Sequence, residues 1–354
     1  MSIEQLFEIA WAKKASDLHL LAETPPLLRI DGELSPVPGE PAFTPQMVKE
    51  LVFSFLTDEQ KEYLTVNKEL DFSLPYGQRA RFRVNAYIQK GTVAASLRLV
   101  PLEIRNIDQL GLPAICHKFA ELRQGFVLVT GPTGHGKSTT LAAIINEINQ
   151  KRRCHIVTIE DPIEFIFPHS KSIVSQRELR TDTHSWEVAL RSVLREDPDV
   201  VLVGEMRDLE TISAALTVAE TGHLVFATLH TNSAAQTVDR IIDVFPQDSK
   251  AQVRMQLSSV LEAVLAQRLL PSLSGGRVVA AEVMLGTPAV KTSIREGKTH
   301  QLDNVIQTSA GLGMMSLESS LAKLVNEGKV ALEVAKNFAL RPEELVRLVK
   351  SSRK

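Results

Sequence analysis

The sequence predicts an α/β protein in which a smaller α+β domain precedes a larger domain built on a parallel sheet. Three observations lead to this prediction. Residues 126–130 form a short apolar run, which a glycine-rich turn and a helical pattern follow. Further apolar runs at 155–159, 200–204 and 224–229 have the spacing of strands that alternate with helices. Residues 71–100 instead alternate with the two-residue period of half-buried antiparallel strands.

Length and composition limit the class of protein. The chain has 354 residues, more than a single domain usually contains, with 44% hydrophobic and 23% charged residues. Its formal net charge of −2 gives no general attraction to nucleic acid, so we expect no nucleic-acid partner. No apolar run is long enough to span a membrane, and the first ten residues lack a secretory signal. The two cysteines have no CxxC spacing, which disfavours a disulfide framework or a zinc knuckle. These observations predict a cytoplasmic protein without a transmembrane segment.

The first part of the chain has the start signals of two helices. One helix is predicted from Ile3 to Lys14, and residues 16–20 alternate as a strand. A second helix is predicted to begin after Thr44, because Thr is a good N-cap and Pro45 suits the first helical position.

Arginines recur on the strands predicted within 71–100. Three of them share one face at every second position, and one follows on the next strand: Arg79, Arg81, Arg83 and Arg98. Such a face is usually solvated. It becomes an anion-binding surface if a phosphate lies opposite.

The turn after the apolar run 126–130 has the spacing of a phosphate-binding loop. It reads G-x-x-x-x-G-K-S and comprises Gly131, Pro132, Thr133, Gly134, His135, Gly136, Lys137, Ser138 and Thr139. Glycines allow successive backbone N–H groups to turn toward phosphate oxygens, and the helix that follows adds its positive N-terminal end. Lys137 is expected to reach the β- and γ-phosphates, and Ser138 to hold Mg²⁺ through its hydroxyl. The alternative, a glycine-rich turn with a surface lysine, leaves the flanking strand and helix unexplained.

Polar residues follow the other three apolar runs, and in parallel sheets ligands bind beyond the carboxyl ends of the strands. Hydrolysis of a nucleoside triphosphate needs a metal, an oriented water and positive charge near the γ-phosphate. Glu205 suits support of Mg²⁺, and His230 suits a sensor of the γ-phosphate. The carboxylate that orients water is left open among Glu160, Asp161 and Glu164, and the candidate charge stabilisers are Arg81, Arg83, Arg98, Arg191 and Arg195.

The rest of the chain completes the predicted organisation. A long amphipathic helix is predicted from Ser249 to Leu270, with Val264 and Leu265 on its apolar stripe. Residues 277–285 are predicted as a strand. The expected parts are an N-terminal domain at 1–100, a linker at 101–123, an ATPase core at 124–286 and a helical region at 287–354.

Four segments in order resemble motifs of the secretion ATPase superfamily of type II and type IV secretion and pilus motors. Residues 16–20 are similar to its N-terminal signature, and 158–165 to its Asp box, which contains Glu160 and Asp161. Residues 198–211 are similar to its Walker B segment. Residues 221–231, with His223, are similar to its His box. The resemblance is strongest to the type IV pilus retraction ATPases of this superfamily.

The resemblance implies a homohexameric ring of subunits, each with a PAS-like N-terminal domain and a RecA-like ATPase domain. ATP bound between the two domains with Mg²⁺ is then hydrolysed to drive pilus retraction and twitching motility. By resemblance, Glu164 polarises the attacking water, Glu205 supports Mg²⁺ through water, and His230 contacts the γ-phosphate region. Arginines of the N-terminal domain move onto the phosphates. The implied partners are an inner-membrane platform protein and a paralogous retraction ATPase, at the cytoplasmic face of the inner membrane.

Two details separate retraction motors from assembly motors in this superfamily. The four-cysteine zinc-binding insertion of assembly motors has no counterpart here, and Ile294-Arg295-Glu296 is similar to the stretch that retraction ATPases need. His135 is a departure, because the family generally has serine there, and we expect it to tune nucleotide affinity. The alternatives are an accessory retraction ATPase, a nucleotide-dependent regulatory ring and a DNA-translocating ATPase, the last disfavoured by net charge.

Overall fold

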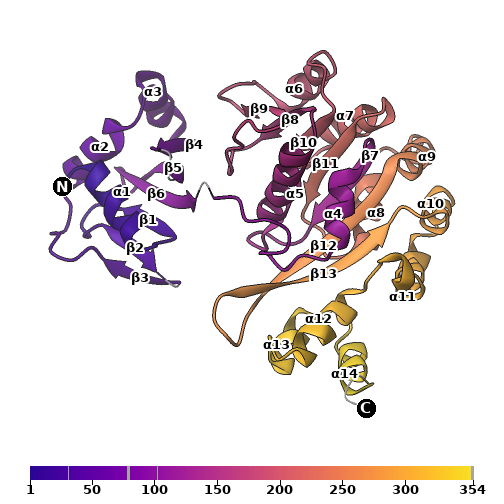
Figure 1. Ribbon diagram of the computed structural model, residues 1–354. Coiled ribbons are helices and arrows are strands. Elements are labelled where there is room, and N and C mark those ends of the chain that lie inside the picture. The colour runs from indigo at the N-terminus through magenta and orange to yellow at the C-terminus, as the bar shows by residue number, and fades with distance from the viewer. Residues whose placement is uncertain (31, 78–79, 102, 352–354) are drawn as a thin grey trace. The chain divides into compact units, whose positions relative to one another are not determined.

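The computed structural model describes residues 1–30, 32–77, 80–101 and 103–351 (Figure 1). Arg79, one of the predicted arginines, lies outside these residues. The chain divides into two units. The first comprises Met1–Glu103 together with Pro162–Ile166, and the second comprises Ile104–Asp161 and Phe167–Lys354. The predicted domain bounds stay predictions. The grouping of 162–166 with the first unit is a feature that no pattern in the sequence indicates.

The first unit is an antiparallel sheet with three helices on one face. Its strand order is β3-β2-β1-β6-β5-β4. The helices are α1 (Ile3–Ala12), α2 (Pro45–Ser54) and α3 (Asp58–Asn67). The strands are β1 (Asp17–Leu20), β2 (Leu27–Ile30), β3 (Glu33–Pro36), β4 (Glu69–Tyr76), β5 (Ala80–Gln89) and β6 (Thr92–Pro101).

Local sequence signals account for the start of these elements. The Thr44 hydroxyl accepts a hydrogen bond from the backbone N–H of Met47, and Pro45 occupies the first position of α2, as predicted. The first helix also forms as predicted and ends two residues before Lys14. On β5 the even-numbered side chains from Ala80 to Ala86 are buried, and the odd-numbered ones, Arg81 and Arg83 among them, lie on the other face. Phe82 stacks on Phe7 of α1, with ring centroids 4.2 Å apart.

The second unit is built on a seven-stranded sheet in the order β13-β12-β7-β11-β10-β8-β9 (Figure 1). All neighbouring strands are parallel except β12 and β13. The strands are β7 (Gly125–Thr130), β8 (His155–Glu160), β9 (Ile173–Glu178), β10 (Val200–Val203), β11 (Leu224–Leu229), β12 (Leu261–Pro271) and β13 (Arg277–Leu285). The helices before α10 are α4 (Ile115–Glu121), α5 (Lys137–Lys151), α6 (Trp186–Val193), α7 (Leu209–Glu220), α8 (Ala234–Asp243) and α9 (Lys250–Val260).

The central strands fix where a ligand can bind. Every residue of β7, β10 and β11 is buried, which is why these segments read as continuous apolar runs. Because these strands and β8 are parallel, their carboxyl ends meet at one edge of the sheet. The residues that follow at that edge are Gly131, Asp161, Gly204 and His230.

The prediction of one long helix from Ser249 to Leu270 is wrong. Helix α9 ends at Val260, and Leu261 turns into the extended strand β12, which lies between β7 and β13. A strand buried on both faces has apolar residues at nearly every position, so it also satisfies the helical spacing that placed Val264 and Leu265 on a stripe. Pairing with β7, more than 130 residues earlier in the chain, selects the strand.

The helical C-terminal region forms as predicted. It contains α10 (Pro288–Arg295), α11 (Leu302–Thr308), α12 (Leu317–Asn326), α13 (Leu332–Phe338) and α14 (Pro342–Ser351), with short 3₁₀ turns at Thr299–Gln301 and Ala310–Leu312. None of the helices in the described part of the chain has the length and apolar character needed to cross a bilayer.

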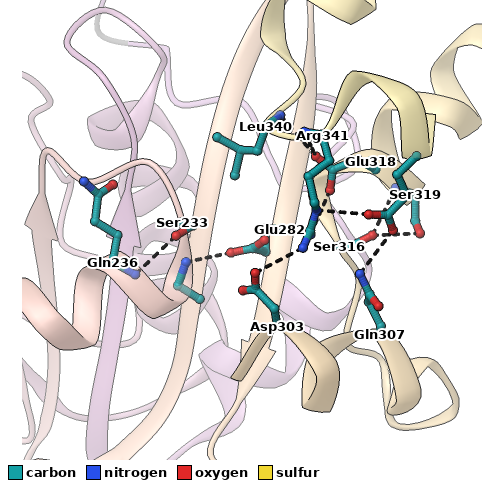
Figure 2. A network of polar contacts seen from close by, with 12 residues as sticks. Ser233, Gln236, Glu282, Asp303, Gln307, Ser316, Glu318, Ser319, Leu340 and Arg341 are labelled. Atoms are coloured by element: carbon teal, nitrogen blue, oxygen red, sulfur yellow. Dashed lines mark hydrogen bonds and ion pairs between the residues drawn. The ribbon is translucent and has the colours of Figure 1, made fainter. Parts of the chain in front are cut away.

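Figure 2 shows the polar contacts that join these helices. Arg341 lies between the carboxylates of Asp303 and Glu318, with nitrogen–oxygen distances of 3.1 Å to each. Glu318 is fully buried and also accepts hydrogen bonds from the backbone N–H groups of Leu340 and Arg341. The buried charge of Glu318 is therefore satisfied within the cluster, as a buried carboxylate requires.

Candidate nucleotide-binding and catalytic site

The loop between β7 and α5 has the shape of a phosphate cradle. Gly136 is the N-cap of α5 and has a φ of 82°, a conformation that favours glycine. Gly131 has a φ of 142°, and a Cβ there would lie 2.5 Å from the carbonyl oxygen of Gln267. Both positions therefore require glycine. The α5 N-terminus that follows supplies free backbone N–H groups and the positive end of the helix dipole.

Lys137 is held inside this loop. Its Nζ donates hydrogen bonds to the carbonyl oxygens of Gly131, at 2.9 Å, and Pro132, at 3.2 Å, and lies 3.4 Å from Nδ1 of His230. The residue is only 8% exposed. Ser138 and Thr139 follow in the first turn of α5 and are half-buried. The ammonium group and the Ser138 hydroxyl thus come from consecutive residues at the start of one helix.

Glu205 follows β10 and is tied to two basic side chains. Arg207 donates to both of its carboxylate oxygens, at 2.8 and 2.9 Å, and Nε2 of His230 lies 2.9 Å from its Oε1. Burial alone would raise the pKa of Glu205. The hydrogen bonds and charge of Arg207, with the hydrogen bond from His230, outweigh burial and hold that pKa below its ordinary value. Glu205 is therefore ionised at neutral pH.

His230 joins the phosphate loop to this carboxylate. With a proton on Nε2, it donates to Glu205, and Nδ1 is left to accept from Lys137 and from the Thr133 hydroxyl at 3.2 Å. One neutral tautomer therefore satisfies all three contacts. The residue is at the end of β11, the strand between β7 and β10, which explains how it reaches both neighbours.

The residues present fit a nucleotide with Mg²⁺. The cradle offers N–H donors and a buried ammonium group, Ser138 offers a hydroxyl, and Glu205 offers an ionised carboxylate at the same edge of the sheet. Among the described residues no group of three or more His, Cys, Asp or Glu side chains could hold a metal alone. A cation here must take most of its ligands from phosphate oxygens and water, as Mg²⁺ usually does.

The three carboxylates of the predicted Asp box separate in the structure. Glu160 is the last residue of β8, is 9% exposed, and accepts hydrogen bonds from Thr158 and Gln176. Asp161 lies 3.8 Å from Arg180. Glu164 belongs to the segment that groups with the first unit, where its Oε1 lies 3.6 Å from Nη1 of Arg83. Adjacent residues in the sequence thus belong to different units.

The predicted arginines also belong to different units, three to the first and two to the second. Arg81 donates to the Ser73 hydroxyl at 2.7 Å, and Arg98, which pairs with Arg83 in the strand register, lies 3.0 Å from Asp17. All three arginines are on the sheet face that the first unit's core does not use. Two others are on the second unit: Arg195 is exposed and precedes β10, whereas Arg191 is paired with Glu187 on α6.

His223 and the Ile294-Arg295-Glu296 stretch lie away from the phosphate loop. His223 precedes β11, so it is at the other end of that strand from His230, and its Nδ1 lies 3.0 Å from the carbonyl oxygen of Val218. Ile294 is buried in the core of the second unit at the end of α10. Arg295 and Glu296 are exposed there, and Glu296 pairs with Lys298 at 2.8 Å.

Sequence reasoning missed Gln267 and Arg268 of β12. Gln267 is fully buried, accepts a hydrogen bond from Thr140 of α5 at 2.8 Å and donates to the carbonyl oxygen of His135 at 2.6 Å. Arg268 donates to the backbone and side-chain oxygens of Asn232, at 3.0 and 2.9 Å. A polar pair inside an apolar run was the available signal, and the helix predicted there concealed it.

Comparison with known proteins completes the description of the site. The family described as "Type II/IV secretion system protein" matches residues 1–297. A protein of Pseudomonas aeruginosa described as "Type IV pilus retractation ATPase PilT" is 47% identical over 97% of this chain and 99% of its own. The "Type IV pilus ATPase PilU" of the same organism is 39% identical over 99% of this chain and 92% of its own. A solved structure of "the Pilus Retraction Motor PilT and Bound ADP" has a TM-score of 0.92, with 45% identity over 98% of this chain and 99% of that one.

Proposed function

Because the chain belongs to the family of type II/IV secretion system proteins, we propose that it is an ATPase that drives type IV pilus retraction. One observation carries the proposal. The relative named as a retraction ATPase is similar over nearly the whole of both chains, and this chain has a phosphate loop, an ionised carboxylate and a histidine gathered at one sheet edge. The identity to this relative is 47%, eight percentage points above the 39% identity to the protein described as a type IV pilus ATPase, which favours the role that the first description names.

In this proposal the second unit binds MgATP. Backbone N–H groups of the loop and Lys137 would hold the β- and γ-phosphates. Ser138 and Glu205 would support Mg²⁺, and the ion when bound would supply positive charge to the phosphates. Phosphate oxygens compete for the Lys137 ammonium with the loop carbonyls that it contacts. His230 keeps contact with both sides of the γ-phosphate region, because it bonds Lys137 and Glu205.

The water that attacks the γ-phosphate needs a carboxylate to orient it. We assign this role to Glu164, which resemblance to the family favours, with Arg81, Arg83 and Arg98 as the arginines that stabilise phosphate charge. The Arg83–Glu164 ion pair in the first unit ties these two assignments together. A change that frees Arg83 for phosphate also frees Glu164 for water.

The biochemical test is Mg²⁺-dependent release of phosphate from ATP by the full chain. Lys137→Ala and Glu205→Ala should each reduce turnover at least a hundredfold, since each removes a charge that acts on the transferred group. Glu164→Gln should reduce kcat by a similar factor with ATP binding retained, and Glu160→Gln is its matched control. If Glu160→Gln alone abolishes turnover, the water-orienting role belongs to Glu160.

The cellular test separates motor from regulator. A strain that lacks the protein should carry more pili and fail to retract them. Unchanged pili would support a regulatory ring, and rescue only when a second retraction ATPase is present would support the accessory role. We further propose a homohexamer that works on the cytoplasmic side against an inner-membrane platform protein, to be tested by sizing the chain with a non-hydrolysable ATP analogue.

A further inference from the structure

His135 is an ionisable residue of the phosphate loop whose side chain the proposed chemistry leaves unused. Its half-buried imidazole is directed to β12, where Nδ1 accepts a hydrogen bond from the backbone N–H of Leu269 at 3.1 Å. Its own carbonyl oxygen accepts from the side-chain amide of Gln267 at 2.6 Å. One loop residue is therefore bonded to the same strand through its ring and through its backbone.

The pairing of β7 with β12 explains why the strand offers these contacts. The last pair between the two strands is Thr130 with Ala266, and β12 continues to Pro271. Beyond Ala266 the phosphate loop, not a strand, lies beside β12. The Leu269 N–H on that side is partly buried and needs an acceptor, because a backbone donor shielded from water without one is costly. The His135 ring supplies it.

The same strand also holds the helix that follows the loop. Gln267 accepts a hydrogen bond from the Thr140 hydroxyl in the first turn of α5, at 2.8 Å, and the pair is buried. The backbone from His135 to Thr140 is thus fastened to β12 at three points, two before Gly136 and one after it. This stretch contains the N–H groups that would meet phosphate.

The His135 ring also lies near the C-terminal helices. The ring of Phe338, the last residue of α13, lies 6.1 Å away between centroids, at an interplanar angle of 55°. Helix α13 packs with the small core that α12 and α14 share. The His135 ring is therefore close both to the strand beside the phosphate loop and to the helical region.

The charges around His135 favour its neutral form. Burial, followed by the cations Arg268 of β12, Lys137 of α5 and Arg277 of β13, lowers the pKa of His135. Arg277 also donates to the carbonyl oxygen of Gly134 at 3.3 Å. In the neutral ring Nδ1 is an acceptor for Leu269. In the charged ring it carries a proton and would oppose the Leu269 N–H donor.

We propose that His135 is a positioning residue of the phosphate loop, which fastens the loop to β12 through Leu269 and links it to the helical region through Phe338. The inference rests on the proposed nucleotide site. It assigns to His135 no contact with phosphate. The role is to hold the loop backbone in the conformation that binds ATP.

Two variants of His135 test the hydrogen-bond acceptor and the aromatic ring separately. His135→Asn keeps an acceptor oxygen near the position of Nδ1, and His135→Phe keeps a ring against Phe338 without any acceptor. The loss of one partly buried hydrogen bond corresponds to roughly a tenfold effect. We therefore expect the KM for ATP to rise about tenfold in His135→Phe and by less than threefold in His135→Asn, with kcat changed less than KM in both.

The pH profile supplies a readout that a merely structural role would not move. In the wild type the KM for ATP should rise toward acid pH, below the ordinary titration range of histidine, because burial and the nearby cations lower the pKa of His135 and protonation removes the acceptor. This rise should be absent in His135→Asn, whose amide does not titrate. Phe338→Leu should raise KM at all pH values and leave the shape of the profile unchanged.

For each variant, binding of a fluorescent ADP analogue and the circular dichroism spectrum are measured together with the kinetics. Equal KM values for wild type and His135→Phe, or an unchanged acid rise in His135→Asn, would overturn the positioning role. If His135→Phe does not fold, the comparison of wild type with His135→Asn still decides through the acid rise. Failure of the proposed function is different, because the wild type itself would then neither bind the analogue nor release phosphate.

Discussion

Replacement of Glu282 by glutamine should stabilise the second unit, and more so as the pH rises. Glu282 is on β13, is 2% exposed, and accepts a hydrogen bond from the backbone N–H of Ala234 at 2.6 Å. Figure 2 shows it beside the cluster of Asp303, Glu318 and Arg341. Burial, together with the charges of Asp303 and Glu318, raises its pKa from 4.5 to about 7. Glutamine keeps an oxygen that can accept from Ala234 and removes the charge.

The magnitude follows from linkage between protonation and folding. The folded pKa is raised, so the stability from this group is fully present below the unfolded pKa and is lost as the pH rises through the folded pKa. A shift of the Glu282 pKa from 4.5 to about 7 lowers the free energy of unfolding by about 3 kcal/mol as the pH rises, and most of this loss occurs below pH 7. Between pH 5.5 and 8, the difference in free energy of unfolding between Glu282→Gln and the wild type should grow by about 2 kcal/mol in favour of the variant.

Urea unfolding followed by tryptophan fluorescence measures this difference. The chain has two tryptophans, Trp11 in the first unit and Trp186 packed against the core of the second. In a Trp11→Phe background the signal reports the second unit, so the two units need not unfold together. Asp303→Asn is the matched control, since it removes a carboxylate from the half-exposed side of the same cluster. A stability difference between Glu282→Gln and the wild type that is equal at pH 5.5 and 8 would refute the reasoning.

Substitutions at three other positions test other parts of the second unit. Arg341→Ala leaves the fully buried Glu318 carboxylate without its cation. It should lower the free energy of unfolding of the second unit by about 3 kcal/mol in the same urea assay. Arg341→Lys should recover part of this loss. Gln267→Leu strips partners from buried Thr140 and from the His135 carbonyl and should cost about 2 kcal/mol, with weaker ADP binding by fluorescence. Gly131→Ala should abolish ADP binding, because its Cβ meets a backbone oxygen that cannot move aside, and normal affinity would contradict the loop geometry.

The parts of the site that sequence could predict are those that short stretches specify. The phosphate loop needs glycine, lysine and serine at fixed spacing in a dozen residues, and the N-cap of α2 needs only Thr44 and Pro45. Strands β7, β10 and β11 are recognisable because they are buried on both faces. Local chemistry decides these features before any distant contact forms.

The features that sequence could not predict depend on pairing across the chain. The sequence of β12 also fits the spacing of a helix, and only its pairing with β7 identifies it as a strand. The division of Glu164 from Glu160 depends on contacts of 162–166 with the first unit, among them the ion pair with Arg83. The His135 ring meets Leu269, 134 residues away, and nothing in either segment indicates the other.

The order of the strands explains how these distant contacts make one site. Neighbouring strands lie about 4.8 Å apart, so β11 separates the ends of β7 and β10 by about 10 Å. A side chain at the end of β11 can therefore reach both, and His230 does so by contacting Lys137 and Glu205. On the other side of β7, β12 supplies Gln267 and the Leu269 N–H to the loop. The phosphate loop is held from both flanks because β7 is an inner strand, and an edge strand would have left one flank without partners.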